Sequence, residues 1–71
     1  MTTTYTATNP RTVYASDIRA HVTRYDVLAV EGPCDWNAGS ITEYPDGVFF
    51  ADCDRGFAQC ESMEVALDCF R

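Results

Sequence analysis

The chain has 71 residues, a length that predicts a single domain. Hydrophobic residues make up 46% and charged residues 23%, a composition that argues for a folded body and against disorder. The net charge is −6, from eleven Asp and Glu residues against five Arg. So small a body buries too little surface for a large catalytic cleft, and no catalytic motif occurs, so we expect a protein that is not an enzyme.

The acidic charge is unevenly distributed along the chain. Residues 1–25 carry a net charge of +2, whereas residues 26–71 carry −8. An acidic surface of this kind repels nucleic acid and anionic membranes, and it attracts basic proteins, many of which bind nucleic acid. The alternative is that the charge only keeps a small protein soluble, which is common at this size.

Four cysteines occur without any Cys-x-x-Cys pair, so the sequence predicts neither a metal site nor a cofactor. The first residues lack the basic start and apolar run of a signal peptide, and no apolar stretch is long enough to span a membrane. We therefore expect a cytoplasmic protein in which the cysteines are reduced and buried. A bridge between Cys53 and Cys60 across neighbouring strands stays open. The four are Cys34, Cys53, Cys60 and Cys69.

The N-terminal segment is rich in Thr, which favours strands, but Pro10 cannot donate to a sheet ladder. Residues 1–10 are therefore expected to form a flexible tail or an edge strand. A single α+β domain is expected over residues 11–71, since no internal repeat divides it.

A helix is predicted over residues 16–25. Ser16 is a suitable N-cap, and three apolar side chains recur at the spacing of one helical face. These are Ile18, Val22 and Tyr25. His21 has no identified catalytic partner and is expected to face solvent on this helix.

The middle of the chain predicts a hairpin. Residues 40–44 and 48–51 flank Pro45-Asp46-Gly47, in which Pro presets one turn position and Gly accepts a positive φ. A third strand follows at 57–60, and the apolar run 27–30 carries the signal of a buried strand. Trp36 lies in a loop between punctuating glycines, where it could anchor a partner or close one end of the core.

A second helix is predicted over residues 62–70, with Ser62 as its cap. Four apolar residues share one face of it, namely Met63, Ala66, Leu67 and Phe70. Three acids share the opposite side, namely Glu61, Glu64 and Asp68. The resulting expectation is an α+β fold in the order α-β-β-β-α, with a possible extra N-terminal strand. Two helices would pack on one face of a small three-stranded antiparallel sheet. They would cover Val27, Leu28, Val30, Ile41, Val48 and Phe50.

The carboxylates are the candidate partner-binding residues. Asp52 and Asp54 lie on the turn that leads towards the acidic stripe, and Asp46 marks the other hairpin turn. Such an array could mimic a DNA phosphate backbone, because carboxylates accept the same charge-assisted bonds from Arg and Lys. A solvated surface is the plain alternative. The candidate set is Asp46, Asp52, Asp54, Glu61, Glu64, Asp68 and Trp36.

In size, acidity, expected α+β order and lack of a catalytic motif, the chain resembles the small phage-encoded anti-CRISPR proteins. Several of these act as double-stranded DNA mimics on type I surveillance complexes. Residues 47–70 are also similar to the strand-strand-helix unit of HicB-type antitoxins, although the DNA-binding extension of that family is missing.

The anti-CRISPR resemblance implies an inhibitor in the bacterial host cytoplasm that blocks target DNA binding by a type I surveillance complex. The expected partner is a basic nucleic-acid-binding complex, with no direct nucleic acid binding, no membrane, and a monomeric or weakly dimeric chain. The alternative is a HicB-like module that neutralises a basic protein through an apolar surface. In that case Trp36, Phe49 and Phe57 should matter more than the acids.

Overall fold

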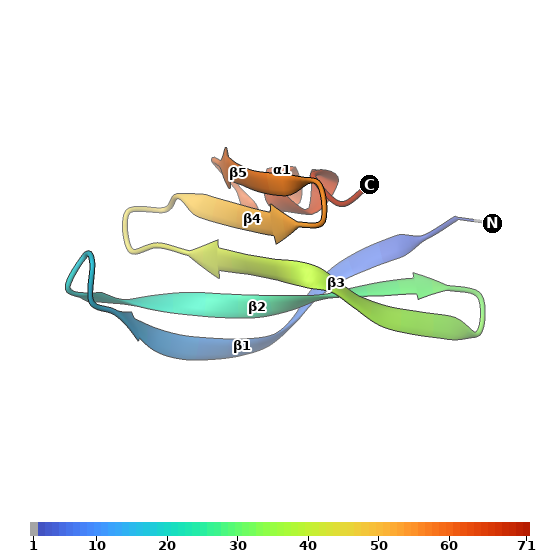
Figure 1. Cartoon of the computed structure of the whole chain (residues 1–71), viewed down its shortest axis with the longest axis horizontal. Helices are drawn as coiled ribbons and strands as arrows, with labels where there is room; N and C mark the ends of the chain where they lie inside the picture. The colour runs from blue at the N-terminus through green and yellow to red at the C-terminus, as the bar shows by residue number, and fades with distance from the viewer. Residues whose placement is uncertain (1) are drawn as a thin grey trace.

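The computed structural model describes residues 2–71 and is mostly β (Figure 1). Five strands form one antiparallel sheet in the order of the sequence, and a short helix follows them. The elements are β1 (Thr4–Ala15), β2 (Ala20–Glu31), β3 (Cys34–Glu43), β4 (Phe49–Cys53), β5 (Gly56–Cys60) and α1 (Met63–Asp68). The predicted α-β-β-β-α fold, with two helices on a three-stranded sheet, is therefore wrong.

The predicted helix over 16–25 is a hairpin instead. Residues 16–19 form the turn between β1 and β2, where Arg19 takes a φ of +53°. The apolar spacing that indicated a helix is overridden by the β-branched and aromatic residues of this segment, which pack well on a sheet. Pairing then extends to Glu31, so the short strand predicted at 27–30 is only the last part of a 12-residue strand.

The hairpin around Pro45-Asp46-Gly47 is confirmed. The backbone N–H of Tyr44 donates to Val48 O at 2.8 Å, and that of Gly47 donates to Tyr44 O at 3.0 Å. Gly47 has a φ of +88°, which explains the need for glycine there. The next strand is confirmed as well, since β5 pairs with β4 along its whole length.

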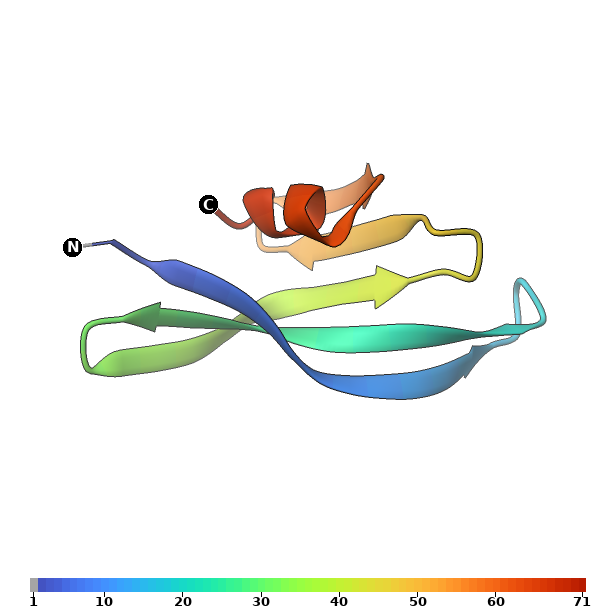
Figure 2. The same ribbon diagram turned by 180° about the vertical axis from the view of Figure 1, so that it is seen from behind.

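The C-terminal helix is confirmed but is shorter than predicted. Ser62 caps it, because its hydroxyl accepts a hydrogen bond from Val65 N at 3.2 Å. Seen from behind, α1 lies across β4 and β5 (Figure 2). Its apolar side points to the sheet, with Ala66 fully buried and Phe70 only 7% exposed.

The core lies between α1 and one face of the sheet. Its buried residues are Val27, Ile41, Ala51, Cys60, Ala66 and Phe70. Side chains alternate between the two faces of a strand, so Ala51 points inward and its neighbour Phe50 points outward. The expectation that a helix covers Phe50 is therefore wrong. The other predicted core residues divide: Ile41 and Val27 are fully buried, whereas Leu28, Val30 and Val48 are only half-buried.

The molecule is elongated because β1, β2 and β3 reach well beyond the shorter β4 and β5. Its principal extents are 42 × 19 × 17 Å. The long strands twist strongly, and β3 crosses over β2 in the view of Figure 1. Two register shifts accompany the twist, one in β1 between Thr8 and Arg11 and one between β2 and β3 beside Val27.

Gly39, on β3, lies against the backbone of the neighbouring strand β4 and against the ring of Phe70. A Cβ there would lie 2.2 Å from Asp52 O and 2.8 Å from the Phe70 ring. We expect Gly39→Ala to lower the free energy of unfolding by about 3 kcal/mol, because backbone and core ring would both have to move. Gly56→Ala is the matched control: its φ is also positive, at +130°, but nothing lies within 4 Å.

Gly56→Ala should lower the free energy of unfolding by about 1 kcal/mol, which is the effect of backbone strain alone. Urea unfolding of both variants measures the difference. Equal destabilisation by the two substitutions would show that the close approach at Gly39 is not a constraint on the fold.

Candidate functional site

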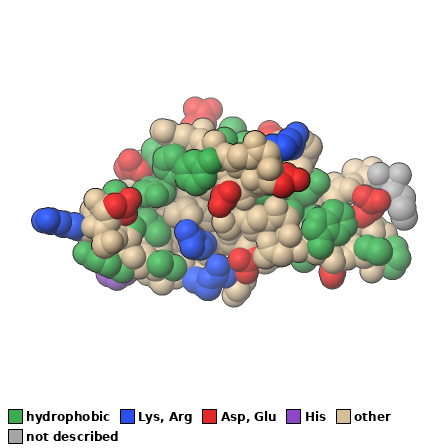
Figure 3. All heavy atoms as spheres, viewed as in Figure 1, with side chains coloured by type: hydrophobic (Ala, Val, Ile, Leu, Met, Phe, Trp, Pro, Cys, Tyr) green, Lys and Arg blue, Asp and Glu red, His purple; other side chains and the backbone are tan. Residues whose placement is uncertain are grey.

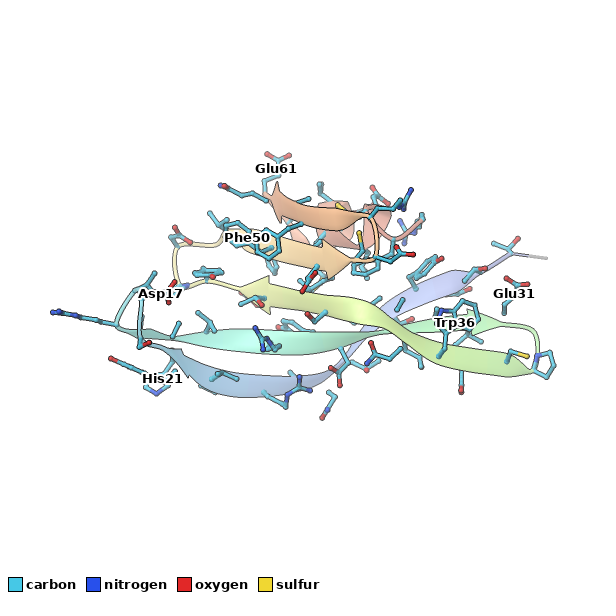
Figure 4. All side chains as sticks on the ribbon, in the orientation of Figure 1. Asp17, His21, Glu31, Trp36, Phe50 and Glu61 are labelled. Atoms are coloured by element: carbon cyan, nitrogen blue, oxygen red, sulfur yellow. The ribbon has the colours of Figure 1, made fainter. Side chains whose placement is uncertain are left out.

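The predicted acidic residues are exposed, but they do not share one face. Glu61 follows β5, and its side chain projects from the outer edge of the sheet (Figure 4). Glu64 and Asp68 lie on the exposed side of α1, as predicted. Asp52 lies on β4 next to inward-facing Ala51, so it points to the opposite face of the sheet. Acidic side chains are accordingly spread across that face rather than gathered on it (Figure 3).

Glu61 lies at the sheet edge just before α1, and Glu64 and Asp68 lie on α1 itself; we call these three residues the helix acidic group. Its members are exposed, and Asp68 forms an ion pair with Arg71 one turn later. Among the described residues, neither Glu61 nor Glu64 forms a salt bridge. Within the described residues, Glu61 and Glu64 are therefore free to bind a basic partner, whereas Arg71 already partly neutralises Asp68.

The second group lies at the turn between β4 and β5. Asp52 and Asp54 line one open hollow of about 550 Å³ on the face opposite α1. Arg11, Arg24 and Asp26 line the same hollow. Because two arginines line this hollow together with the three aspartates, it is less anionic than the sequence alone predicts.

Asp46 has a structural role within its turn. Its Oδ1 accepts a hydrogen bond from the backbone N–H of Val48 at 3.2 Å. This local bond is the usual reason for Asp at such a position. The residue is exposed, so the carboxylate can still contribute to the surface charge.

Trp36 lies on β3 and not in a loop, which corrects the sequence prediction. The residue is 44% exposed and lies at the end of the sheet near the β2–β3 turn (Figure 4). It lines an open hollow of about 410 Å³ together with Tyr5, Phe70, Asp54 and Arg55. The structure therefore brings Trp36 and Asp54 to one surface, and it leaves Trp36 half open to a partner.

An aromatic patch lies on the sheet face that α1 leaves open, and we define it as Tyr44, Phe50 and Phe57. Phe50 and Phe57 stack with ring centroids 5.1 Å apart, and Tyr44 meets Phe50 edge-on at 5.0 Å. Phe57 is 68% exposed. Strand alternation in the sequence could have predicted this patch, but we expected a helix to cover Phe50. Phe49, named beside Phe57, instead packs half-buried against the core.

His21 is exposed on β2, where it stacks edge-on against Tyr14 at 5.3 Å. In residues 2–71, no group of three His, Cys, Asp or Glu side chains is placed to hold a metal ion. No described helix is long and apolar enough to cross a membrane.

An ion pair joins β1 to β2 in the lining of the hollow that also contains Asp52 and Asp54. Arg11 donates to both carboxylate oxygens of Asp26, at 3.0 and 3.1 Å, and Asn9 donates to the same side chain at 3.1 Å. These bonds hold the pKa of Asp26 below its usual value, with Arg11 the larger cause. The stability that the pair contributes is therefore complete above the unfolded-state pKa and is lost as pH falls through the lower folded-state pKa.

We expect the melting temperature of Asp26→Asn to lie below that of the original protein at neutral pH. The gap should narrow as the pH falls below about 4, where the carboxylate takes up a proton. Thermal melts followed by circular dichroism between pH 7 and pH 2 test this. A gap that stays constant over that range would mean that the ionised form of Asp26 does not stabilise the fold.

Comparisons with protein-family models, with curated proteins and with solved structures find no match to this chain. The surface has four features that could bind a partner. These are the helix acidic group, Asp52 and Asp54 near the β4–β5 turn, the partly exposed Trp36 and the aromatic patch.

Proposed function

We propose that this protein is an inhibitor that binds a basic, nucleic-acid-binding protein complex through its exposed carboxylates. The observation that carries the proposal is an exposed acidic segment on a small body. Residues 46–71 contain six Asp and Glu residues against two Arg. All six carboxylates are exposed, and of these six only Asp68 forms an ion pair with another described residue.

This arrangement suits recognition of a basic surface more than catalysis. Exposed carboxylates keep their hydration until a partner arrives, and they can accept bidentate bonds from Arg or single bonds from Lys. The same charge raises the rate of encounter with a basic partner and repels nucleic acid. The inhibitor would therefore compete with nucleic acid for its partner without binding nucleic acid itself.

The particular partner that we propose is a type I CRISPR surveillance complex, which would make the protein an anti-CRISPR acting in the bacterial host cytoplasm. The helix acidic group and the pair at the β4–β5 turn would take the place of DNA phosphates. The chain would act as a monomer or a weak dimer.

Co-migration on a sizing column tests whether this complex is bound. We expect the protein to elute with the purified surveillance complex, and we expect prior loading of target duplex DNA to prevent this. Co-elution that is unaffected by DNA would show a binding site away from the DNA channel. The absence of co-elution at low salt would contradict this choice of partner.

The aromatic patch favours a second candidate function, a HicB-like module that neutralises a basic protein through an apolar surface. Phe57 is the most exposed large hydrophobic residue described, and its ring stacks on Phe50, which lies on the same open face of the sheet. Stacked, solvent-facing aromatics are typical anchors of protein interfaces. Binding that survives about 0.5 M salt and is lost in Phe57→Ala would favour this candidate, because salt screens charge pairs but not apolar contacts.

A further inference from the structure

Three of the four cysteines meet where α1 ends against the sheet. The thiol of Cys60, on β5, lies 3.7 Å from the thiol of Cys69, the C-cap residue of α1. Cys69 Sγ also approaches the backbone oxygen of Val65 at 3.6 Å. Cys53 Sγ lies 3.8 Å from the backbone oxygen of Cys69. Cys34 is exposed at the start of β3, next to the β2–β3 turn.

We propose that Cys60 and Cys69 form an intramolecular disulfide on exposure to a small-molecule disulfide, tying β5 to the C-terminal end of α1. The two sulfurs need to close from 3.7 Å to a bond length of about 2.05 Å. Rotation of two short side chains supplies such a movement, and the sulfur hydrogen bonds lost in it are weak.

The sheet register decides which pair can bond. Cys53 lies opposite Gly56, whereas Cys60 lies opposite Phe49 at the other end of the β4–β5 pair. The two cysteines are separated by about 13 Å along the strands, so a Cys53–Cys60 bridge does not fit this fold. The thiol of Cys53 approaches only the backbone oxygen of Cys69, whereas the thiol of Cys60 approaches the thiol of Cys69.

The environment of the thiols sets the order of the reaction. Burial raises the pKa of Cys60, so this thiol stays protonated to a higher pH than an exposed cysteine does. Cys69 is only half-buried and is the expected first nucleophile.

The thiolate of Cys69 attacks the small disulfide, forms a mixed disulfide and releases one small thiolate. Cys60 then attacks the Cys69 sulfur, and the second small thiolate leaves with the proton of Cys60. Two protein thiols are thus oxidised to one disulfide, and the small disulfide is reduced to two thiols.

Digestion with trypsin after oxidation identifies the bond directly. The chain contains no Lys, so cleavage after Arg places Cys34 and Cys53 in peptide 25–55 and places Cys60 and Cys69 in peptide 56–71. The native protein is incubated with oxidised glutathione, the remaining thiols are alkylated, and the peptides are weighed. We expect peptide 56–71 to lose two hydrogens and to carry neither glutathione nor the alkylating group.

The disulfide should also raise the melting temperature by about 10 °C, since it closes a loop in the unfolded chain, and dithiothreitol should reverse this rise. Cys60→Ser and Cys69→Ser should each abolish the change. Cys53→Ser is the matched control, a half-buried thiol beside the same segment, and should retain it.

Two results would overturn the proposal. One is a covalent link between peptides 25–55 and 56–71, which would assign the bond to Cys53. The other is a peptide 56–71 that keeps two alkylated thiols, or retains glutathione, while Cys34 in the same sample carries glutathione and so shows that the oxidant acted.

Discussion

Replacing Phe70 with Ala is expected to unfold most of the protein at 37 °C. The ring is 7% exposed and belongs to the core between α1 and the sheet. It also lies 6.2 Å from the ring of Tyr5 on β1, so it links the C-terminal segment to the N-terminal strand. Truncating a buried Phe costs about 3–5 kcal/mol, which is about the whole net stability expected of so small a core.

Phe57→Ala is the control for this substitution. The same atoms are removed, but from a side chain that is 68% exposed and stacks on one neighbour. We expect a loss below about 1 kcal/mol. Urea unfolding of both variants followed by tryptophan fluorescence measures the contrast. If the two variants were equally stable, the core assigned beneath α1 would be wrong.

Charge reversal of the helix acidic group is expected to weaken partner binding by about 100-fold or more. Substituting Glu61, Glu64 and Asp68 by Lys removes three carboxylates that would meet basic side chains, and it places three cations there. Each lost contact is expected to cost at least about 1 kcal/mol, and like-charge contacts add to this. All three positions are exposed, so the fold should be kept, as a thermal melt would show.

A second triple variant controls for net charge. Substituting Asp17, Glu31 and Asp35 by Lys changes the charge by the same amount on the β1–β2–β3 part of the sheet. We expect this variant to keep most of the binding. Equal losses in the two variants would show that only total charge matters, and a fully active helix-group variant would exclude that group as the binding surface.

The local features of the β4–β5–α1 unit were predictable because residues close together in the sequence determine each of them. Pro45 and Gly47 specify their turn through backbone preference, and Ser62 specifies the start of α1 through its hydroxyl. The long strands were not predictable in the same way. Residues 20–25 satisfy a helical spacing as well as a strand alternation, and only pairing with β1 and β3, distant in sequence, decides between them.

The candidate site was predictable in composition but not in arrangement. The sequence placed Glu64 and Asp68 together correctly, since four residues is one helical turn. It could not show that Asp52 points away from them, because this depends on which face of β4 receives the helix. It also placed Phe50 beneath a helix, whereas α1 covers the face to which the neighbouring Ala51 points, so this ring is on the open face.

The most direct test of the proposed inhibition is a competition for DNA. A purified type I surveillance complex is mixed with labelled target duplex and increasing amounts of this protein, at about 0.1 M and about 0.5 M salt. We predict that the protein displaces the duplex and that a higher concentration is needed at the higher salt, because salt screens the carboxylate contacts. Undiminished DNA binding at saturating protein and low salt would contradict the account.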